Sequence, residues 1–188
     1  MQTIKEMIEE SADLKKKVVQ LTPQIGKAAK MIESALAKGN KLILAGNGGS
    51  SSQASHIAAE FTGRYKKERR SLPSISLSSE MSAVTAIGND YGYDFVFSRQ
   101  LEGLGSKGDV FVALSTSGNS INLIKAIEAA KKKGIATISL LGKDGGKMKG
   151  KADLDIIIPS QNTPRVQESH LMVLHIICEI VEERLCAQ

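Results

Sequence analysis

Short apolar runs alternate with longer amphipathic segments along this chain. Apolar residues recur at helical spacing over residues 3–19 and 22–38, which predicts two helices before any strand. Five short apolar runs then predict buried strands, at residues 41–45, 72–77, 109–114, 135–140 and 153–158. Helical patterns lie at residues 53–61, 82–87, 93–104, 120–133 and 163–185. Strands that alternate with helices predict an α/β fold, with a parallel sheet covered by helices on both faces.

Residues that favour the ends of helices mark where these elements are expected to begin and end. Thr22 with Pro23 is a good cap and first turn for the second helix, and Thr163 with Pro164 caps the last one. The stretch 46–52 is expected to be a flexible loop, 88–92 a turn, and 142–150 a loop with one helical turn. No repeat or linker interrupts the pattern, so residues 1–188 are expected to form a single domain. Residues 1–39 are its helical extension, whose apolar face either covers the sheet or packs against another subunit.

Composition and charge narrow the class of protein. The 188 residues are 41% hydrophobic and 24% charged, which is ordinary globular composition, and no apolar run approaches the roughly 20 residues of a membrane span. The first ten residues are acidic and amphipathic, so we expect a cytoplasmic protein without a secretory signal. Cys178 and Cys186 lie two turns apart on one predicted helix, too far for a disulfide. Both are expected to be buried or half-buried reduced thiols.

The net charge of +5 raises the question of an anionic partner. Basic residues gather at positions 64–70 and 131–133, but no aromatic residues alternate with them, as a nucleic-acid surface would favour. We therefore interpret them as a solvated loop and a helix C-terminus, where lysines suit the helix dipole. A general attraction for phosphorylated substrates is a further interpretation.

Two loops follow predicted strands and are rich in glycine and hydroxyl groups. Ser115, Thr116, Ser117 and Ser120 stand where the backbone N–H groups of a helix start are unpaired, and such a place binds phosphate. The alternative is an ordinary helix cap, since serine is also a favoured cap. The other loop holds Gly46, Gly48 and Gly49 without the spacing of a dinucleotide fingerprint, so no nucleotide cofactor is expected. Both loops end strands where α/β sheets bind ligands, which indicates a phosphorylated polyol or sugar.

The histidines of the chain fall on two predicted helices. His56 and Glu60 are four residues apart and share a helix face, while His170 and His175 lie on the last helix with Gln167. Spacing alone leaves two interpretations open. These residues are either functional or structural, since a His/Glu pair at this spacing is also a common weak surface pair.

Several motifs together resemble the sedoheptulose-7-phosphate isomerases, or phosphoheptose isomerases, of the sugar-isomerase (SIS) domain superfamily. The match runs from about residue 20 to the end of the chain and keeps the order and spacing of the motifs. Its parts are Ala45–Ser50, His56 with Glu60, Thr62–Tyr65, Gly88–Gly92, Phe97–Gln100, Ser115–Ser120 and Arg165–Glu168 with His175.

The resemblance implies a fold, an assembly and a reaction. The fold is a three-layer sandwich with a five-stranded parallel sheet, and the assembly is a homotetramer built with the N-terminal helices. The reaction interconverts sedoheptulose 7-phosphate and D-glycero-D-manno-heptose 7-phosphate through an enediol. It is the first step toward ADP-heptose, which serves lipopolysaccharide biosynthesis or other heptose-containing glycans.

The resemblance also implies roles for residues that match the motifs. Glu60 and His175 are the acid/base pair, and zinc is the expected metal, held by His56, Glu60, Gln167 and His175. The phosphate contacts are expected from Ser115, Thr116, Ser117 and Ser120, with Ser50 nearby. The sugar contacts are expected from Asn47, Gly48, Gly49, Asn89 and Asp90.

Helix geometry adds a constraint that does not depend on the family. Gln167 and His175 are eight residues apart on one predicted helix, roughly 12 Å along its axis and about 80° around it. A zinc ion takes such ligands at about 2.1 Å, so one helix is poorly placed to supply both to one ion. We therefore predict that His175 or Gln167 comes from a neighbouring subunit.

Other functions of the superfamily remain as alternatives. Some SIS proteins are non-catalytic tetramers that bind a replication initiator, and others sense sugar phosphates within transcription regulators. The His56, Glu60, Gln167 and His175 set argues against a pure scaffold, and no helix-turn-helix pattern is present for a regulator. An isomerase acting on another ketose phosphate is the third alternative.

Overall fold

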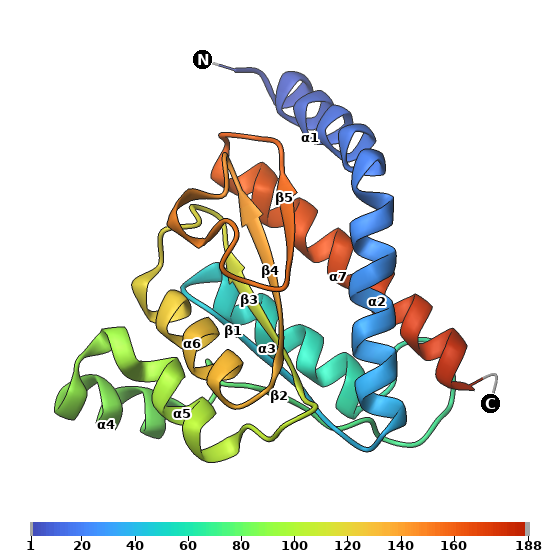
Figure 1. Ribbon diagram of the computed structural model, residues 1–188. Helices are drawn as coiled ribbons and strands as arrows, with labels where there is room; N and C mark the ends of the chain where they lie inside the picture. The colour runs from blue at the N-terminus through green and yellow to red at the C-terminus, as the bar shows by residue number, and fades with distance from the viewer. Residues whose placement is uncertain (1, 187–188) are drawn as a thin grey trace.

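A five-stranded parallel sheet forms the centre of the molecule in the computed structural model, which describes residues 2–186 (Figure 1). The strand order is β2-β1-β3-β4-β5, and every neighbouring pair is parallel. The predicted α/β fold with a five-stranded sheet is confirmed. The strands are β1 (Leu42–Gly46), β2 (Ser74–Ser76), β3 (Val110–Ser115), β4 (Ala136–Gly142) and β5 (Leu154–Ile158). The central strands β1 and β3 are buried along their whole length, because helices cover both faces.

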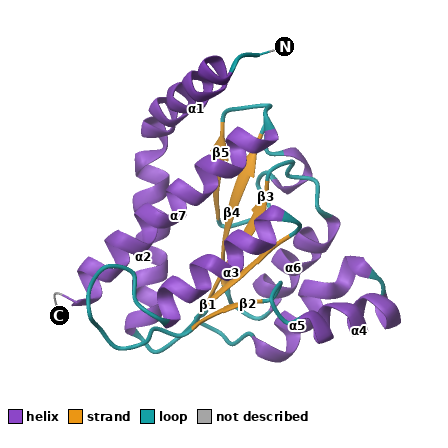
Figure 2. Cartoon of the chain, turned by 180° about the vertical axis from the view of Figure 1, so that it is seen from behind, coloured by secondary structure: helices purple, strands orange, loops and turns teal. Residues whose placement is uncertain are grey.

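The helices form two layers with separate cores. One face of the sheet packs on α2, α3 and α7, and Figure 2 shows α3 and α7 lying across it. The other face packs on α5 and α6. Beyond the sheet, α4 contacts α5 and the short turn at Tyr93–Phe95. The helices are α1 (Ile4–Val18), α2 (Thr22–Ala37), α3 (Gly49–Thr62), α4 (Met81–Tyr91), α5 (Val96–Leu104), α6 (Ile121–Lys132) and α7 (Thr163–Cys186).

The N-terminal extension has two parts with different packing. The apolar face of α2 is buried against α7 and the sheet. Of the two alternatives, this helix therefore covers the sheet and does not leave its apolar face for another subunit. In contrast, α1 begins at a capping box formed by Thr3 and Glu6 and buries only Leu14 and Val18. It extends beyond the sheet in Figure 1 and leaves Ile4 and Ile8 exposed.

Four local predictions were wrong. Residues 49–52, expected in a loop, already form the first turn of α3, because Gly48 at a φ of 54° turns the chain straight from β1 into the helix. Residues 88–91, expected in a turn, continue α4, and the chain reverses only at Gly92 with a φ of 91°. Thr22 is helical rather than a cap, because its hydroxyl donates to the carbonyl of Val19 in the turn that joins α1 to α2. Cys186 is exposed, although Cys178 is a buried free thiol as expected.

The carboxyl ends of the strands indicate where a ligand binds in this fold. In this strand order the direction of the winding reverses between β1 and β3, which is the switch point where α/β sheets bind ligands. The loops after β1 and β3 therefore open at the same place. Within residues 2–186, none of the helices combines the length and apolar character that a bilayer crossing requires.

Candidate active site

The two hydroxyl-rich loops lie side by side at the carboxyl edge of the sheet. Gly46 at the end of β1 pairs with Leu114 of β3, one residue before the serine loop, which we define as residues 115–120. The parallel pairing sends both chains out of the sheet in the same direction. The register thus places both loops at the same edge of the sheet, where the prediction put them.

The serine loop is organised by its own polar groups. The hydroxyls of Ser115 and Ser120 lie 3.1 Å apart and share a hydrogen bond, and the N–H of Gly118 donates to Ser115 Oγ at 3.1 Å. Ser115 is buried, whereas Thr116, Ser117 and Ser120 are half-buried and open to a ligand. Ser120 occupies the N-cap position of α6, but its side chain makes no capping hydrogen bond. This observation favours an anion site over the ordinary helix cap, because Ser120 does not cap the N–H groups of the first turn. Of these groups, the N–H of Leu123 donates to Asn122 Oδ1 at 2.9 Å.

The loop after β4 supports the serine loop from outside. The N–H of Met148 donates to the carbonyl of Gly118 at 2.9 Å, and the N–H of Lys147 donates to Asn119 Oδ1 at 3.1 Å. Gly118 has a φ of 65°, and a Cβ there would collide with the carbonyl oxygen of Gly145. Only glycine permits this conformation and this close approach, so the shape of the loop depends on residue 118.

The start of α3 lies at the same edge of the sheet as the serine loop. Gly48 and Gly49 are exposed there, and Ser50 is buried below them. A Cβ at Gly49 would lie 2.5 Å from the side-chain nitrogen of Gln167, so this glycine allows α7 to reach the start of α3. Gln167 also points its amide at Ser50 Oγ, 3.4 Å away, while Gln53 donates to the Gln167 carbonyl at 2.7 Å.

A cluster of three ionisable side chains joins α3 to α7. His56 Nε2 lies 3.0 Å from His175 Nε2 and 3.3 Å from Glu60 Oε1. His56 and Glu60 share one face of α3, as their spacing predicts, and His175 meets them from α7, 119 residues further along the chain. Tyr65 completes the surroundings, since its ring stacks on His175 at 5.8 Å between centroids and 29° between planes.

The surroundings of His175 bias its protonation. Partial burial lowers the pKa of His175 below its usual value, the neighbouring His56 lowers it further, and Glu60 opposes both. At neutral pH the ring is therefore neutral and has one nitrogen free to accept a proton or bind a metal.

The three side chains fit a metal ion by type and by spacing. Their ligand atoms all lie within 4.8 Å of one another. Ligands held at about 2.1 Å and at tetrahedral angles lie about 3.4 Å apart, close to the 3.0 and 3.3 Å separations around His56. Two imidazoles and one carboxylate form a known catalytic zinc set that leaves a fourth position open.

The predicted metal ligand Gln167 and the predicted sugar contacts Asn89 and Asp90 lie away from this cluster in the chain. The amide of Gln167 points at Ser50, and His56 is six residues further along α3, roughly 9 Å away. Helix geometry predicted that Gln167 and His175 of one chain do not both bind the same ion. Within this chain, His175 joins His56 and Glu60, and Gln167 does not. Asn89 and Asp90 are exposed on α4, where the Asn89 amide donates to Asp90 Oδ1 at 2.8 Å.

Sequence reasoning missed three side chains beside the site. Asn122 is buried and exchanges two amide hydrogen bonds with Asn47, at 3.0 and 2.9 Å, and the hydroxyl of Tyr93 donates to Asn47 Oδ1 at 2.9 Å. Tyr65 against His175 is the third. Asn122 had a signal, because it is the second residue of the helix that directly follows the serine loop.

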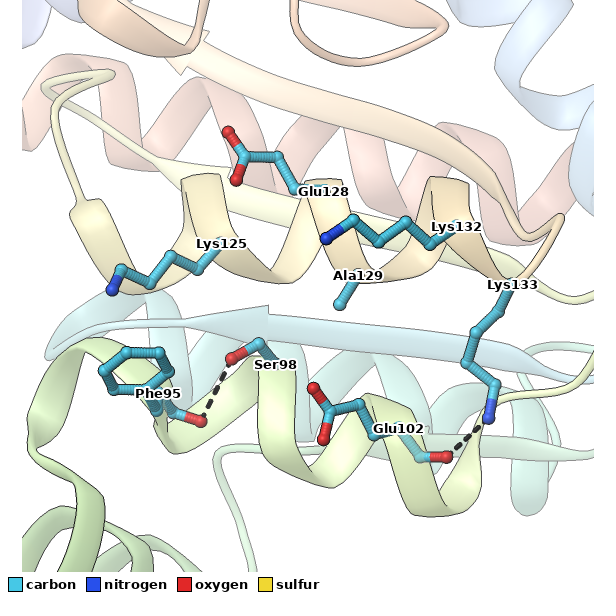
Figure 3. A pocket seen from close by; sticks show the side chains of 8 residues that line it. All are labelled: Phe95, Ser98, Glu102, Lys125, Glu128, Ala129, Lys132 and Lys133. Carbon is cyan, nitrogen blue, oxygen red and sulfur yellow. Dashed lines mark hydrogen bonds between the residues drawn. The ribbon is translucent and has the colours of Figure 1, made fainter.

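Two hollows on the surface lie outside the serine loop, and only the second is lined by a predicted site residue. A cavity of about 320 Å³ lies between α5 and α6, where Lys125 lies over the ring of Phe95 at 3.6 Å and Lys133 donates to the carbonyl of Glu102 (Figure 3). This cavity is on the face of the sheet opposite α3 and α7. A second hollow, of about 440 Å³, borders the cluster and is lined by His175, Tyr65 and residues of α1 and α7.

Comparison with known proteins agrees with the geometry. Residues 6–142 match the SIS domain. The phosphoheptose isomerase of Sulfurimonas denitrificans is 51% identical over 185 residues, which cover 97% of this chain and 95% of the relative. The structure of phosphoheptose isomerase GmhA from Neisseria gonorrhoeae superposes with a TM-score of 0.88 at 38% identity, covering 96% and 100% of the two chains. A phosphoheptose isomerase structure from Francisella tularensis gives 0.92 at 32% identity, with 96% of each chain covered. The chain thus belongs to the SIS-domain family and, within it, to the phosphoheptose isomerases.

Proposed function

We propose that this isomerase interconverts D-sedoheptulose 7-phosphate and D-glycero-D-manno-heptose 7-phosphate. The observation that carries the proposal is the placement of two chemistries along one helix. The start of α3 borders the serine loop, and the cluster of Glu60, His56 and His175 lies further along the same helix. A sugar phosphate bound along α3 thus has an anion site at one end and proton-transfer groups at the other.

The proposed phosphate site consists of hydroxyls and N–H groups. Ser115, Thr116, Ser117 and Ser120 hold the phosphate with Ser50, and the uncapped start of α6 adds the positive end of a helix dipole. Asn47, Gly48, Gly49, Asn89 and Asp90 contact the sugar. These contacts set the register of the chain, so that the carbonyl end of the substrate reaches the cluster.

The proposed acid/base pair is Glu60 with His175. Isomerisation moves a proton between adjacent carbons and another between their oxygens, which requires a base beside the carbon and a donor or acceptor beside the oxygens. Glu60 takes the carbon-bound proton and returns it to the neighbouring carbon. His175, neutral because its pKa is lowered by burial, exchanges the proton of the oxygens.

The proposed metal is zinc, one ion per site, held by His56, Glu60 and His175, with Gln167 as the fourth ligand. When bound, a zinc ion supplies a Lewis acid that polarises the substrate carbonyl. Gln167 of the same chain points at Ser50, so we propose that the Gln167 ligand comes from a neighbouring subunit.

We propose that the chain assembles as a homotetramer with active sites shared between subunits. The exposed apolar side chains of α1 support an oligomeric role for residues 1–39. A largely apolar groove of about 280 Å³ between α1, α2 and α7, bordered by Ile176 and Ile180, supports the same role. The hollow beside His175 reaches Lys15 of α1, so the proposed interface adjoins the cluster. Asn89 and Asp90, remote from the cluster within the chain, are then available to a neighbouring site.

We place this reaction in the cytoplasm, as the first step of ADP-heptose biosynthesis for lipopolysaccharide. The basic residues at 64–70 do not form a nucleic-acid surface in this proposal. Arg69 among them is turned inward to Glu182, with only 6% of its side chain exposed. Neither nucleic acid nor membrane is among the proposed partners.

Turnover of sedoheptulose 7-phosphate by the purified protein tests the proposal. The wild type is expected to produce the aldose, and Glu60→Gln and His175→Gln are each expected to lose that activity while remaining folded. Absence of turnover by the wild type, with or without added zinc, contradicts the proposal and favours a non-catalytic SIS tetramer. Faster turnover of a shorter ketose phosphate points instead to an isomerase of another substrate. Full activity in both variants would refute the assigned roles.

A further inference from the structure

Arg69 and Glu182 form a buried ion pair next to the cluster. Arg69 Nε lies 2.9 Å from Glu182 Oε1, and only 6% and 3% of the two side chains are exposed. Such a pair loses the hydration of both charges, and this is tolerated only when the remaining donors and acceptors also find partners. Here they do, because the carboxylate accepts three further hydrogen bonds and the guanidinium donates four.

The carboxylate of Glu182 holds the loop that follows α3. It accepts hydrogen bonds from three successive N–H groups, those of Tyr65 at 2.9 Å, Lys66 at 2.7 Å and Lys67 at 2.9 Å. Burial acts to raise the pKa of Glu182, but these N–H groups and Arg69 outweigh it and hold the pKa below its usual value. The group is therefore ionised throughout the neutral range.

The guanidinium of Arg69 holds the end of α3. It donates to the carbonyls of Glu60 at 2.7 Å and Phe61 at 2.9 Å, which lie in the last turn of the helix. Two further carbonyls, those of Gly63 and Arg70, accept at 3.1 and 3.0 Å. A cation at this point satisfies carbonyl groups that a helix end leaves unpaired. One of these carbonyls belongs to Glu60 itself.

Tyr65 transmits this arrangement to His175. Its N–H is one of the three groups fixed by Glu182, and its ring stacks on the ring of His175. His175 is thus enclosed between the Tyr65 ring and His56, whose ring is 5.2 Å away. Glu182 lies seven residues after His175 on α7, roughly 10 Å along the helix, so the ion pair does not touch His175 and its contact with that ring runs through Tyr65.

We propose that Arg69, Glu182 and Tyr65 form a positioning unit, here called the clasp, for the two acid/base residues. The clasp fixes the end of α3 that carries Glu60 and sets the orientation of the His175 ring. Stability alone does not account for it, because a buried ion pair is often no more stabilising than apolar side chains of the same volume. The proposal rests on the proposed roles of Glu60 and His175.

Variants of Tyr65 test the clasp without removing a buried charge. Tyr65→Leu keeps an apolar side chain but loses the stacked ring, and Tyr65→Phe keeps the ring and loses only the hydroxyl. We expect Tyr65→Leu to lower kcat 10- to 100-fold with KM within threefold, as is usual when the support of a reactive histidine is removed. Tyr65→Phe is expected to restore kcat to within threefold of the wild type. Glu33→Gln, which weakens the ion pair between Arg184 of α7 and Glu33 of α2, is the matched control and leaves kcat unchanged.

A spectroscopic measurement on the same variants separates positioning from folding. The chain has only three histidines, so their ring Hε1 signals are assignable in a ¹³C-histidine-labelled protein with the same chelator in every sample. The His175 signal should move in Glu182→Gln, which keeps the Tyr65 ring, and should move in Tyr65→Leu by more than the lost ring current of Tyr65 accounts for. It should return in Tyr65→Phe, while the buried His170 signal stays in place. If Glu182→Gln does not fold, the two Tyr65 variants decide the matter.

Two results would overturn the clasp. The first is a His175 signal that is unchanged in Glu182→Gln, or that moves in Tyr65→Leu only by the lost ring current, which means that the clasp does not set the orientation of the imidazole. The second is a loss of kcat that follows the folded fraction in thermal unfolding, or that Tyr65→Phe does not rescue. The histidine signals do not depend on turnover, so they decide the clasp even if the wild type fails to isomerise the heptose phosphate.

Discussion

The serine loop and the His/Glu cluster are two parts of one site that are built in different ways. The serine loop takes its hydroxyls from six consecutive residues between β3 and α6, and its hydrogen bonds are mostly internal. The cluster takes His56 and Glu60 from α3 and His175 from α7, and its geometry depends on how two helices pack. The functional groups of the first are brought together by a short stretch of chain, with support from the loop after β4, whereas those of the second come together only through the packing of two helices distant in sequence.

The two parts also differ in charge. The serine loop contains no ionisable side chain, so it offers hydrogen bonds and a helix dipole to a ligand that brings its own charge. The cluster contains three ionisable groups in contact, with the pKa of His175 lowered by burial and by His56. This difference indicates a division of work, in which the loop binds and the cluster transfers protons. The predictions below test that division.

The largest effect is expected at the cluster. Glu60→Gln and His175→Gln should each lower kcat about 1,000-fold and leave KM within about threefold, because proton transfer by a positioned side chain contributes roughly 10²- to 10⁴-fold. Steady-state kinetics with sedoheptulose 7-phosphate measures both constants. An effect on KM alone would show that the cluster binds substrate and does not transfer protons.

The next largest effect is on the free energy of unfolding, and it comes from His170 on α7. His170 is buried on this helix with Nε2 3.0 Å from the carbonyl of Leu141, and burial lowers its pKa to about 4 despite that hydrogen bond. The unfolded chain binds this proton near pH 6.5, whereas the folded protein binds it only near pH 4. Stability is therefore complete above pH 6.5 and falls as the pH drops toward 4, by about 3 kcal/mol.

Chemical denaturation of wild type and His170→Gln between pH 7 and pH 4 measures this effect. The amide of the variant keeps a donor for the Leu141 carbonyl but does not titrate, so its stability should change less over the same interval. Parallel pH curves for the two proteins would show that His170 does not contribute. The serine loop, without titratable side chains, should add nothing to either curve.

A smaller effect is expected at the serine loop. Ser117→Ala removes one proposed hydrogen bond to the phosphate, and hydrogen bonds to charged groups contribute about 1.5–3 kcal/mol. We expect kcat/KM to fall about 10- to 100-fold, mainly through KM, with the folded structure unchanged. Inorganic phosphate as a competitive inhibitor provides the check, since its inhibition constant should rise in parallel. A fall in kcat with unchanged phosphate inhibition would contradict the division between the two parts.

The smallest effect is expected beside the crevice. Tyr93→Phe removes the hydroxyl that donates to Asn47 Oδ1 but leaves the two amide hydrogen bonds between Asn47 and Asn122. A single neutral hydrogen bond contributes about 1 kcal/mol, so KM should rise about fivefold or less. Asn122→Ala, which removes both side-chain hydrogen bonds to Asn47, should raise KM more than Tyr93→Phe does. Equal effects of the two variants would show that the amide pair does not hold Asn47.

Local patterns account for the parts of the fold that could be predicted. Apolar runs such as residues 109–114 are buried strands whichever neighbours they have, and the helical spacing of His56 and Glu60 places them on one face without further information. Two of the four wrong local predictions concern glycines. Gly48 and Gly88 both suggested irregular structure, but the first starts a helix at once and the second lies within one, because packing decides which conformation a glycine adopts.

The sequence by itself determined the order of strands and helices, the hydroxyl loop after β3 and, through its motifs, the family to which the chain belongs. Only the tertiary structure decided that His175 meets His56 within one chain while Gln167 turns to Ser50. It also decided that Arg69 lies buried against Glu182 and that Tyr65 stacks on His175. The physical reason is the distance along the chain over which each kind of interaction acts. Hydrophobic spacing and turn residues act over a few positions of the chain, whereas contacts between residues more than a hundred positions apart depend on how α3 and α7 pack across the same face of the sheet.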